Sequence, residues 1–186
     1  MNRIFDIVFS SALGIAFLVP FIIITILIKL TSKGPILYWS RRIGKNNREF
    51  LMPKFRSMRI DTPVVATHLL KDANSFLTPI GNFLRKSSLD ELPQLYCIIT
   101  GDMSFVGPRP ALYNQYDLID LRANKKVHTL VPGITGWAQI NGRDELSIEE
   151  KVKFDKEYLD RKSLMFNFHI LFLTMLKVVR KDGIQH

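Results

Sequence analysis

The pattern of hydrophobic and polar positions divides the chain near residue 30. Residues 7–28 read IVFSSALGIAFLVPFIIITILI and carry no charge. As a helix this run would extend about 33 Å, slightly more than the ~30 Å hydrocarbon core of a bilayer, and it has no polar face. A secretory signal is the alternative, but the run is too long and no small-residue cleavage site ends it. The pattern therefore predicts a membrane-inserted helix over residues 1–30 and a separate domain over residues 31–186.

Pro20 interrupts the apolar run near its middle. A proline inside a helix removes one backbone hydrogen bond and clashes with the preceding turn, so it kinks or breaks the helix. The helix can therefore cross the bilayer once with a kink, or bend at Pro20 and return to the face that it entered. The residues alone leave both possibilities open. Basic residues are more numerous after the run than before it, which predicts that the following domain is cytoplasmic.

Short strands and helices are predicted from residue 34 onward. Residues 34–58 read as two extended segments joined by a basic turn that contains Asn46 and Asn47. A helix is expected to start at Thr78 as N-cap. Another is expected to begin within KSSLDELPQL, residues 86–95.

The second half of the chain is predicted to be mainly helical. Residues 110–126 are expected to form a helix, and the glycine-rich residues 132–143 a loop. Ser147 and Glu150 have the spacing of a capping box, which predicts the start of a further helix. The apolar residues 163–183 fit a core helix or an interfacial helix, and the interfacial position is favoured. The expected fold class is α+β, helix-rich with few short strands and no βαβ alternation, with interfacial amphipathic helices.

Composition adds a strongly basic charge balance. Lysines and arginines number 26 against 17 aspartates and glutamates, which gives a net charge of +9. Such a balance predicts an anionic partner: a nucleic acid, an anionic membrane surface or a phosphorylated small molecule. Nucleic acid is disfavoured because no helix-turn-helix or other recognition pattern is evident. The single cysteine, Cys97, excludes an internal disulfide and a cysteine-cluster zinc site.

The adjacent acids Asp90 and Glu91 are unusual in so basic a chain. A structural interpretation is available, since Ser88 and Glu91 match a capping box and acids in a first turn complement the helix dipole. Pro93 would then be the fifth helical residue, where its missing N–H deletes a hydrogen bond. Starting the helix with Asp90 as its cap would avoid this cost. The neighbouring cations favour a chemical role instead.

Five basic side chains are candidates for binding phosphate around this acidic pair. One lies between two prolines in GPRP, which holds its guanidinium in a rigid extended segment. Another follows a glycine-containing turn in NGR, two lie two residues apart in KFRSM, and one lies shortly before the pair. A divalent cation, usually Mg²⁺, would let carboxylates and phosphates share one site. The candidates are Asp90 and Glu91 for catalysis and metal, and Arg109, Arg143, Lys54, Arg56 and Arg85 for phosphate.

Four sequence blocks resemble one known family. KFRSM, LRKSSLDELPQL, GDMSFVGPRP and PGITGWAQINGR are similar, in order and spacing, to the signature blocks of the bacterial sugar transferases. These are monotopic phosphoglycosyltransferases that begin glycan assembly on polyprenol phosphate. The resemblance covers nearly the whole chain and includes the N-terminal apolar helix.

The resemblance implies a two-step reaction. An aspartate attacks the β-phosphate of a UDP-sugar and releases UMP, and polyprenol phosphate then takes the phosphosugar from the enzyme. Carried onto this chain, the nucleophile is Asp90, and Glu91 assists with metal or proton. Arg143 and Arg109 handle phosphates, and Arg85 supports the site. The family also implies a re-entrant helix broken at Pro20, Mg²⁺, and a location on the cytoplasmic face of the bacterial inner membrane.

Two other functions are carried as alternatives. One is a membrane-anchored basic module that binds nucleic acid or anionic lipid without catalysis. The other is an enzyme that transfers the sugar without its phosphate, which would release UDP in place of UMP. Residues 60–75 match none of the four blocks and are expected to select the sugar. The identity of the sugar, the glycan pathway and the oligomeric state are left open by the sequence.

Overall fold

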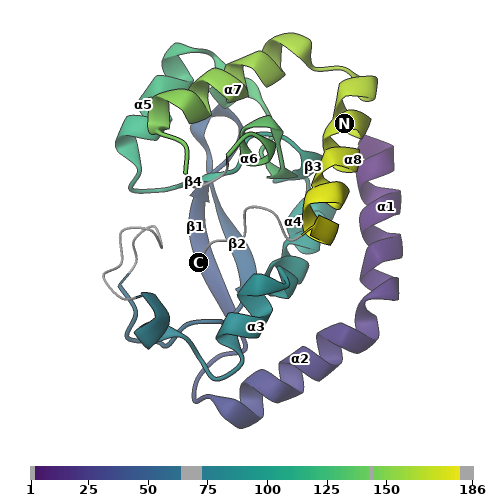
Figure 1. The fold of residues 1–186 in the computed structure, drawn as a ribbon, viewed down its shortest axis with the longest axis vertical. Coiled ribbons are helices and arrows are strands. Elements are labelled where there is room, and N and C mark those ends of the chain that lie inside the picture. Colours follow the sequence, from purple (N-terminus) through teal and green to yellow (C-terminus); the bar gives the residue numbers. More distant parts are fainter. Residues whose placement is uncertain (1–2, 64–72, 143–144, 181–186) are drawn as a thin grey trace.

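Two small sheets and the helices that cover them form the body of the protein, and a bent helix pair follows its edge (Figure 1). The computed structural model describes residues 3–63, 73–142 and 145–180. The predicted composition of the fold is confirmed, because helices dominate and the strands are short.

The N-terminal apolar run forms two helices, α1 (Arg3–Ala16) and α2 (Leu18–Thr31), which are bent by 60° relative to each other. The bend falls at Phe17, one turn before Pro20. A proline ring clashes with the carbonyl four residues earlier, here that of Ala16, which is the last residue of α1. In the part of the chain that the structure describes, no single helix is both long and apolar enough to cross a bilayer. The bent pair meets that test only when its two halves are taken together.

Polar side chains on α1 attach this helix to the body of the protein. The guanidinium of Arg3 donates to the carbonyls of Ile98 and Ile99. Asp6 is buried, and its Oδ2 accepts a hydrogen bond of 2.9 Å from the hydroxyl of Ser104. Since buried charges require partners, these bonds define which face of α1 points inward.

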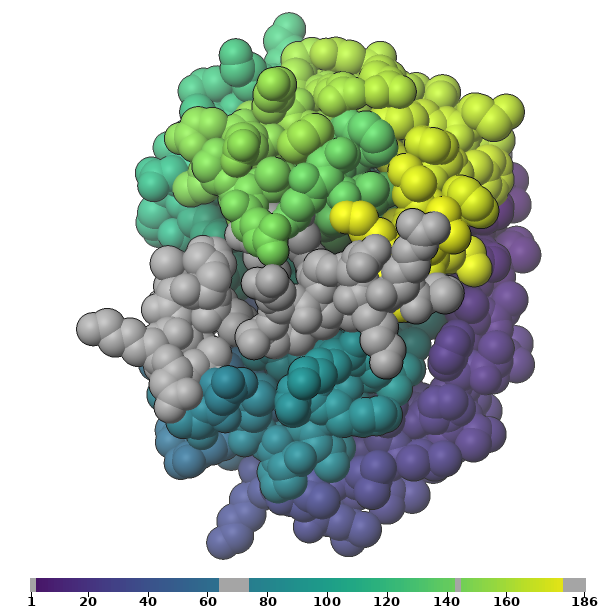
Figure 2. Space-filling model, in the orientation of Figure 1, coloured from purple at the N-terminus to yellow at the C-terminus, as the bar shows by residue number. Residues whose placement is uncertain are grey.

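The helix α2 packs on the body through apolar residues. Ile24 and Ile28 are buried in a small core cluster with Phe55 and Leu84. The opposite faces of the helix pair are apolar and exposed, and in Figure 2 the pair occupies one edge of the molecule. Exposed apolar side chains on the pair include Ile4, Val8, Ile15, Leu18, Val19, Ile22, Ile23, Ile26 and Leu30.

The predicted hairpin is confirmed as β1 (Leu37–Ile43) and β2 (Glu49–Phe55), which pair antiparallel from Leu37↔Phe55 to Ile43↔Glu49. The turn between them contains the short 3₁₀ helix η1 (Lys45–Asn47). Asn46 and Asn47 have φ of 56° and 58°, a left-handed conformation that asparagine tolerates better than most residues.

The helix predicted over residues 110–126 is wrong at its start. Residues Ala111–Leu112 form strand β4, which extends the hairpin sheet by pairing with the end of β1. The helix α5 covers only Tyr116–Asn124. The local pattern is compatible with a helix. The backbone of residues 111 and 112 instead forms its hydrogen bonds with β1, which is about 70 residues away in sequence.

The loop predicted over residues 132–143 is also wrong. It contains β5 (Gly133–Thr135), which pairs in parallel with β3 (Ser104–Val106), and the short helix α6 (Trp137–Ile140). The glycines permit close packing here and do not indicate a loop. A Cβ on Gly133 would lie 2.1 Å from the backbone nitrogen of Gly107.

Gly133→Ala is therefore expected to destabilise the protein by about 3 kcal/mol, because backbone atoms cannot move aside as a flexible side chain can. The measurement is the free energy of unfolding in detergent. Gly14→Ala in α1 is the matched control, since a Cβ there meets nothing within 4 Å. Equal stability of the Gly133 and Gly14 variants would contradict the close approach of β3 and β5.

The helix predicted from Thr78 begins later than expected. Ile80 occupies the N-cap position of α3 (Gly81–Lys86), and the hydroxyl of Thr78 instead donates to the carbonyl of Ser57. The predicted capping box of Ser147 and Glu150 is confirmed. The other helices are η3 (Ala73–Phe76), η4 (Leu89–Gln94), α4 (Leu95–Thr100), η5 (Val127–Thr129), α7 (Ile148–Arg161) and α8 (Leu164–Arg180).

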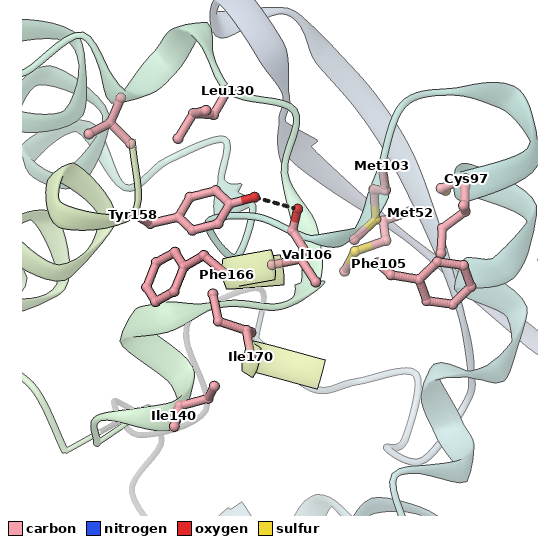
Figure 3. Packing of buried hydrophobic residues seen from close by; sticks show 12 residues of the cluster. Met52, Cys97, Met103, Phe105, Val106, Leu130, Ile140, Tyr158, Phe166 and Ile170 are labelled. Carbon is pink, nitrogen blue, oxygen red and sulfur yellow. Dashed lines mark hydrogen bonds between the residues drawn. The ribbon is translucent and has the colours of Figure 1, made fainter. Parts of the chain in front are cut away.

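The main core brings α7 and α8 against β3. Tyr158 of α7 is almost fully buried and donates to the carbonyl of Val106, 3.2 Å away (Figure 3). Phe166 and Ile170 of α8 fill the same cluster. Other positions of α8 are exposed and apolar, among them Met165, Phe168, Phe172, Met175 and Val178. This helix therefore has both a core face and an exposed apolar face.

Candidate active site

The acidic pair lies at the start of a 3₁₀ helix. Ser88 has φ of 55°, and η4 begins directly after it, at Leu89. The side chain of Ser88 makes no capping hydrogen bond. The capping box predicted for Ser88 and Glu91 is therefore wrong, and Asp90 is not the cap either, since it is already the second residue of η4. Both acids do lie in the first turn of η4, as the structural interpretation expected, but neither of them acts through a capping hydrogen bond.

Glu91 is neutralised by two cations from different elements. Its Oε1 accepts from Lys54 Nζ of β2 at 3.0 Å and from Arg109 Nη2, in the segment before β4, at 2.8 Å. Burial alone would raise the pKa of Glu91, but Arg109 and Lys54 outweigh burial and hold this pKa well below its usual value. Glu91 is therefore ionised at neutral pH and fixed in position.

Asp90 has a different environment from its neighbour. It is only 8% exposed, and no hydrogen bond or ion pair to its carboxylate is found among the described residues. Burial raises the pKa of Asp90, partly countered by Lys54, and the charge of Glu91 raises it further. Two adjacent carboxylates thus have pKa values shifted in opposite directions, which is typical of sites where they perform different tasks.

Sequence reasoning missed Arg42 as a site residue. In the pleated hairpin, Ser40 and Arg42 lie on the same face as Lys54, and Arg42 donates to Ser40 Oγ at 3.0 Å and to the Pro110 carbonyl at 3.1 Å. Burial, then the charge of Arg109, lowers the pKa of Arg42 to about 10. The spacing of Ser40 and Arg42, two residues apart and therefore on one face of a strand, was the signal that could have found it.

The other predicted cations have separate locations. Arg85 contributes to the charge around Asp90, and its Nη1 contacts the sulfur of Met58 at 3.4 Å. Arg56 lies just beyond the end of β2 and donates to the carbonyl and hydroxyl of Ser32 at 3.1 and 2.7 Å, whereas Lys54 pairs with Glu91; a phosphate-binding role for Arg56 stays a prediction. Arg143 lies outside the described residues, as do residues 64–72 of the segment expected to select the sugar.

The oxygen donors for a metal are few. Across residues 3–63, 73–142 and 145–180, no group of three or more histidine, cysteine, aspartate or glutamate side chains could hold a metal ion. Asp90 and Glu91 are nevertheless hard oxygen donors in adjacent positions. Mg²⁺ commonly takes one or two carboxylates and completes its coordination with substrate phosphates and water. The donor set therefore suits a metal shared with a phosphorylated substrate, and does not suit an all-protein cage.

The structure thus brings two adjacent carboxylates together with the cations Lys54 and Arg109, and comparison with known proteins identifies the family of the chain. A family model described as Bacterial sugar transferase matches residues 1–181. The chain belongs to this family, and the resemblance found in its four sequence blocks is confirmed.

Several curated relatives carry informative names. The UDP-glucose:undecaprenyl-phosphate glucose-1-phosphate transferase of Escherichia coli K12 is 38% identical over 186 residues, which are 95% of this chain and 40% of that protein. The uncharacterized sugar transferase EpsL of Bacillus subtilis 168 is 37% identical and is matched over 90% of its length. The exopolysaccharide production protein ExoY of Rhizobium meliloti is 36% identical and is matched over 87%. The chain thus spans less than half of the first relative and most of the other two.

Proposed function

We propose that this protein transfers a sugar-1-phosphate from a UDP-sugar to polyprenol phosphate, such as undecaprenyl phosphate, and releases UMP. The names of the Escherichia coli and Xanthomonas campestris relatives support the reaction class. The observation that carries the proposal for this chain is the contrast between two adjacent carboxylates. Glu91 is committed to Lys54 and Arg109, whereas Asp90 is buried beside them without an ion pair among the described residues.

The contrast assigns a role to each side chain. A carboxylate oxygen of Asp90 attacks the β-phosphorus, the bond from that phosphorus to the bridging oxygen breaks, and UMP leaves with the electron pair. An oxygen of polyprenol phosphate then attacks the same phosphorus and releases Asp90. Covalent catalysis of this kind divides one difficult transfer into two easier steps. Lys54 and Arg109 lie where negative charge develops on the transferring group, and Glu91 holds them in place.

Mg²⁺ is the proposed cofactor, with Asp90 and Glu91 as the residues that would hold it. When bound, the ion would neutralise charge on the diphosphate and on the leaving UMP. The raised pKa of Asp90 supports this assignment, because a buried carboxylate without an ion pair gains from a divalent cation. Lys54 and Arg109 both bind Oε1 of Glu91, so the other carboxylate oxygen of Glu91 is the one that would bind the ion.

The site is proposed to lie at the cytoplasmic face of the bacterial inner membrane. The exposed apolar faces of α1, α2 and α8 support this position, since their side chains would otherwise face water. Phe5 of α1 and Phe168 of α8 are in contact, with ring centroids 5.7 Å apart, so two of these faces are neighbours. Docking at the interface would bring the lipid acceptor and the soluble donor to one site.

The helix pair is proposed to be re-entrant, with both ends on the cytoplasmic side. Both halves are attached to the body of the protein, α1 through Arg3 and Asp6 and α2 through Ile24 and Ile28. A helix that crossed the bilayer would carry one of these halves away from its buried contacts. The bend at Phe17 supports the return of the chain to the face that it entered.

Cysteine labelling tests the re-entrant geometry. Ile4→Cys and Lys33→Cys, both at exposed positions on either side of the bend, are expected to react with a membrane-impermeant maleimide only from the cytoplasmic face of oriented vesicles. Cys97 is fully buried and serves as the internal control, since it should react only after denaturation. Labelling of the two variants from opposite faces would show a spanning helix.

The reaction is tested by product analysis. Detergent-solubilised protein with Mg²⁺, polyprenol phosphate and a panel of UDP-sugars is expected to release UMP with one or a few of the sugars. Release of UDP would indicate transfer of the sugar without its phosphate. Silence across the panel, with protein shown to be folded, would refute the proposal.

A further inference from the structure

The Gly-Pro-Arg-Pro segment that presents Arg109 is held mainly by its carbonyl groups. Pro108 and Pro110 have no N–H, so neither can donate a backbone hydrogen bond. Instead, three consecutive carbonyls accept. Pro108 accepts from the backbone nitrogen of Gly133 at 3.0 Å, Arg109 from Arg122 Nη1 at 2.8 Å, and Pro110 from Arg42 Nη1 at 3.1 Å. Two side chains from different elements therefore complete the anchoring of this segment.

A buried acid on α7 fixes the guanidinium of Arg122. Asp155 of α7 is 1% exposed, and its Oδ2 accepts from Arg122 Nε at 2.9 Å and from Nη2 at 2.7 Å. One guanidinium thus donates twice to Asp155 and once to the carbonyl of Arg109. The planar fork of arginine provides three such directed N–H groups, and the ammonium of lysine does not provide this geometry.

These bonds form a connected path to the acidic pair. It runs from Asp155 to Arg122, to the backbone of Arg109, and through the Arg109 side chain to Glu91 at 2.8 Å. Arg122 lies on α5 and Asp155 on α7, so neither belongs to the elements that carry Lys54, Asp90 or Glu91. A displacement of the Arg109 backbone would move its guanidinium away from the carboxylate that it neutralises.

We propose that Arg122, oriented by Asp155, is a positioning residue that acts through Arg109 in the sugar-phosphate transfer. This inference rests on the proposed function. Arg122 contacts neither substrate nor reacting atoms, and its effect on turnover depends on Arg109 being present. It keeps the guanidinium of Arg109 at the place where the transferring phosphate is bound.

A double-mutant cycle tests this dependence. Arg122→Lys, Arg109→Lys and the double variant are compared with the wild type by kcat/KM for UMP release and by melting temperature. Arg122→Lys alone is expected to lower kcat/KM by about 10-fold to 100-fold, since small misplacements of positioning groups have effects of this size. In the Arg109→Lys background the further loss is expected to be less than about twofold, whereas the decrease in melting temperature should be the same in both backgrounds.

An exposed ion pair on α7, the helix that also carries Asp155, provides the control. Lys156→Gln removes the charge that pairs with Asp160 and should leave kcat/KM unchanged. Multiplicative losses in the double variant, or full activity of Arg122→Lys, would overturn the inference. Asp155→Asn provides the same cycle with an isosteric change if Arg122→Lys does not fold. Wild-type protein that released no UMP would overturn the proposed function itself. If the wild type is active but the losses of kcat/KM in the two single variants multiply in the double variant, only the positioning role is overturned.

Discussion

Asp90→Asn is expected to abolish UMP release, with at least an approximately 1000-fold loss of kcat/KM, and at the same time to raise the stability of the protein. An amide cannot replace the attacking carboxylate. It does, however, remove a buried negative charge that is without an ion pair among the described residues. A gain of stability with complete loss of function is the behaviour of a residue kept for chemistry at a cost to the fold.

The pH dependence of this gain follows from the raised pKa of Asp90. At low pH the carboxyl is protonated in the folded and unfolded states, so wild type and variant should be equally stable. As the pH rises from the usual value of 3.8 through the higher folded value, the folded wild type holds its proton longer and loses relative stability. The difference in melting temperature should therefore grow with pH and then level off above the folded value.

Melting curves between pH 3 and pH 8, together with the UMP assay, measure both effects. Asp160→Asn, at an exposed position of α7, is the control and should change neither activity nor stability appreciably. Retention of full activity by Asp90→Asn would remove Asp90 as the nucleophile. A large loss of stability at neutral pH would show that its carboxylate is a structural group.

Glu91→Gln should have the opposite effect on the fold. Its free energy of unfolding is expected to fall by about 3 kcal/mol at neutral pH, because Lys54 and Arg109 lose the charge that compensates their burial. UMP release should fall as well, since both cations are then free to move. Guanidinium denaturation in detergent measures the first effect, and steady-state kinetics measure the second.

The pH dependence of Glu91 has the reverse sign. Its pKa is lowered, so its stabilising contribution is fully present above the usual value of 4.5 and is lost as the pH falls through the lower folded value. The difference between wild type and Glu91→Gln should therefore shrink in acid. Glu49→Gln is the matched control, because Glu49 pairs with Arg41 at exposed positions, where an ion pair contributes less than about 1 kcal/mol. Equal effects of the two glutamine variants would contradict a buried role for Glu91.

Local signals in the sequence were sufficient for part of this fold. The hairpin of β1 and β2 and the capping box of Ser147 and Glu150 were predicted because the residues that determine them lie within a few positions of one another. The four sequence blocks were likewise sufficient for the family. In each case the decisive interaction or pattern is contained in one short stretch.

Interactions between distant segments were not predictable in the same way. The strands β4 and β5 are two and three residues long, and they are strands only because β1 and β3 supply partners. Ser88 and Glu91 match a capping box by spacing, but Lys54 and Arg109 compete successfully for the Glu91 carboxylate. Residue spacing predicts what a side chain can do locally, and it does not report which distant charges are available.

The candidate site was predicted best where several cations converged on one acid. Lys54, Arg109 and Glu91 meet as expected, and Arg85 contributes to the charge around Asp90. Arg122 and Asp155 were missed because they pair with each other across α5 and α7, and Arg42 because, besides the nearby Ser40, its partner is the carbonyl of Pro110, 68 positions away. No short motif records such contacts.

The attachment of α1 has a consequence for the order of folding. Asp6 is separated from its hydrogen-bond partner Ser104 by 98 positions, and Arg3 reaches carbonyls of residues 98 and 99. During synthesis the ribosome makes α1 long before these partners exist. The carboxylate of Asp6 therefore cannot accept its hydrogen bond from Ser104 at that stage. Contacts of such long sequence separation form late, since the intervening chain must first be ordered. The helix α1 is therefore synthesised well before its partners and is among the last elements to reach its final hydrogen-bonded state.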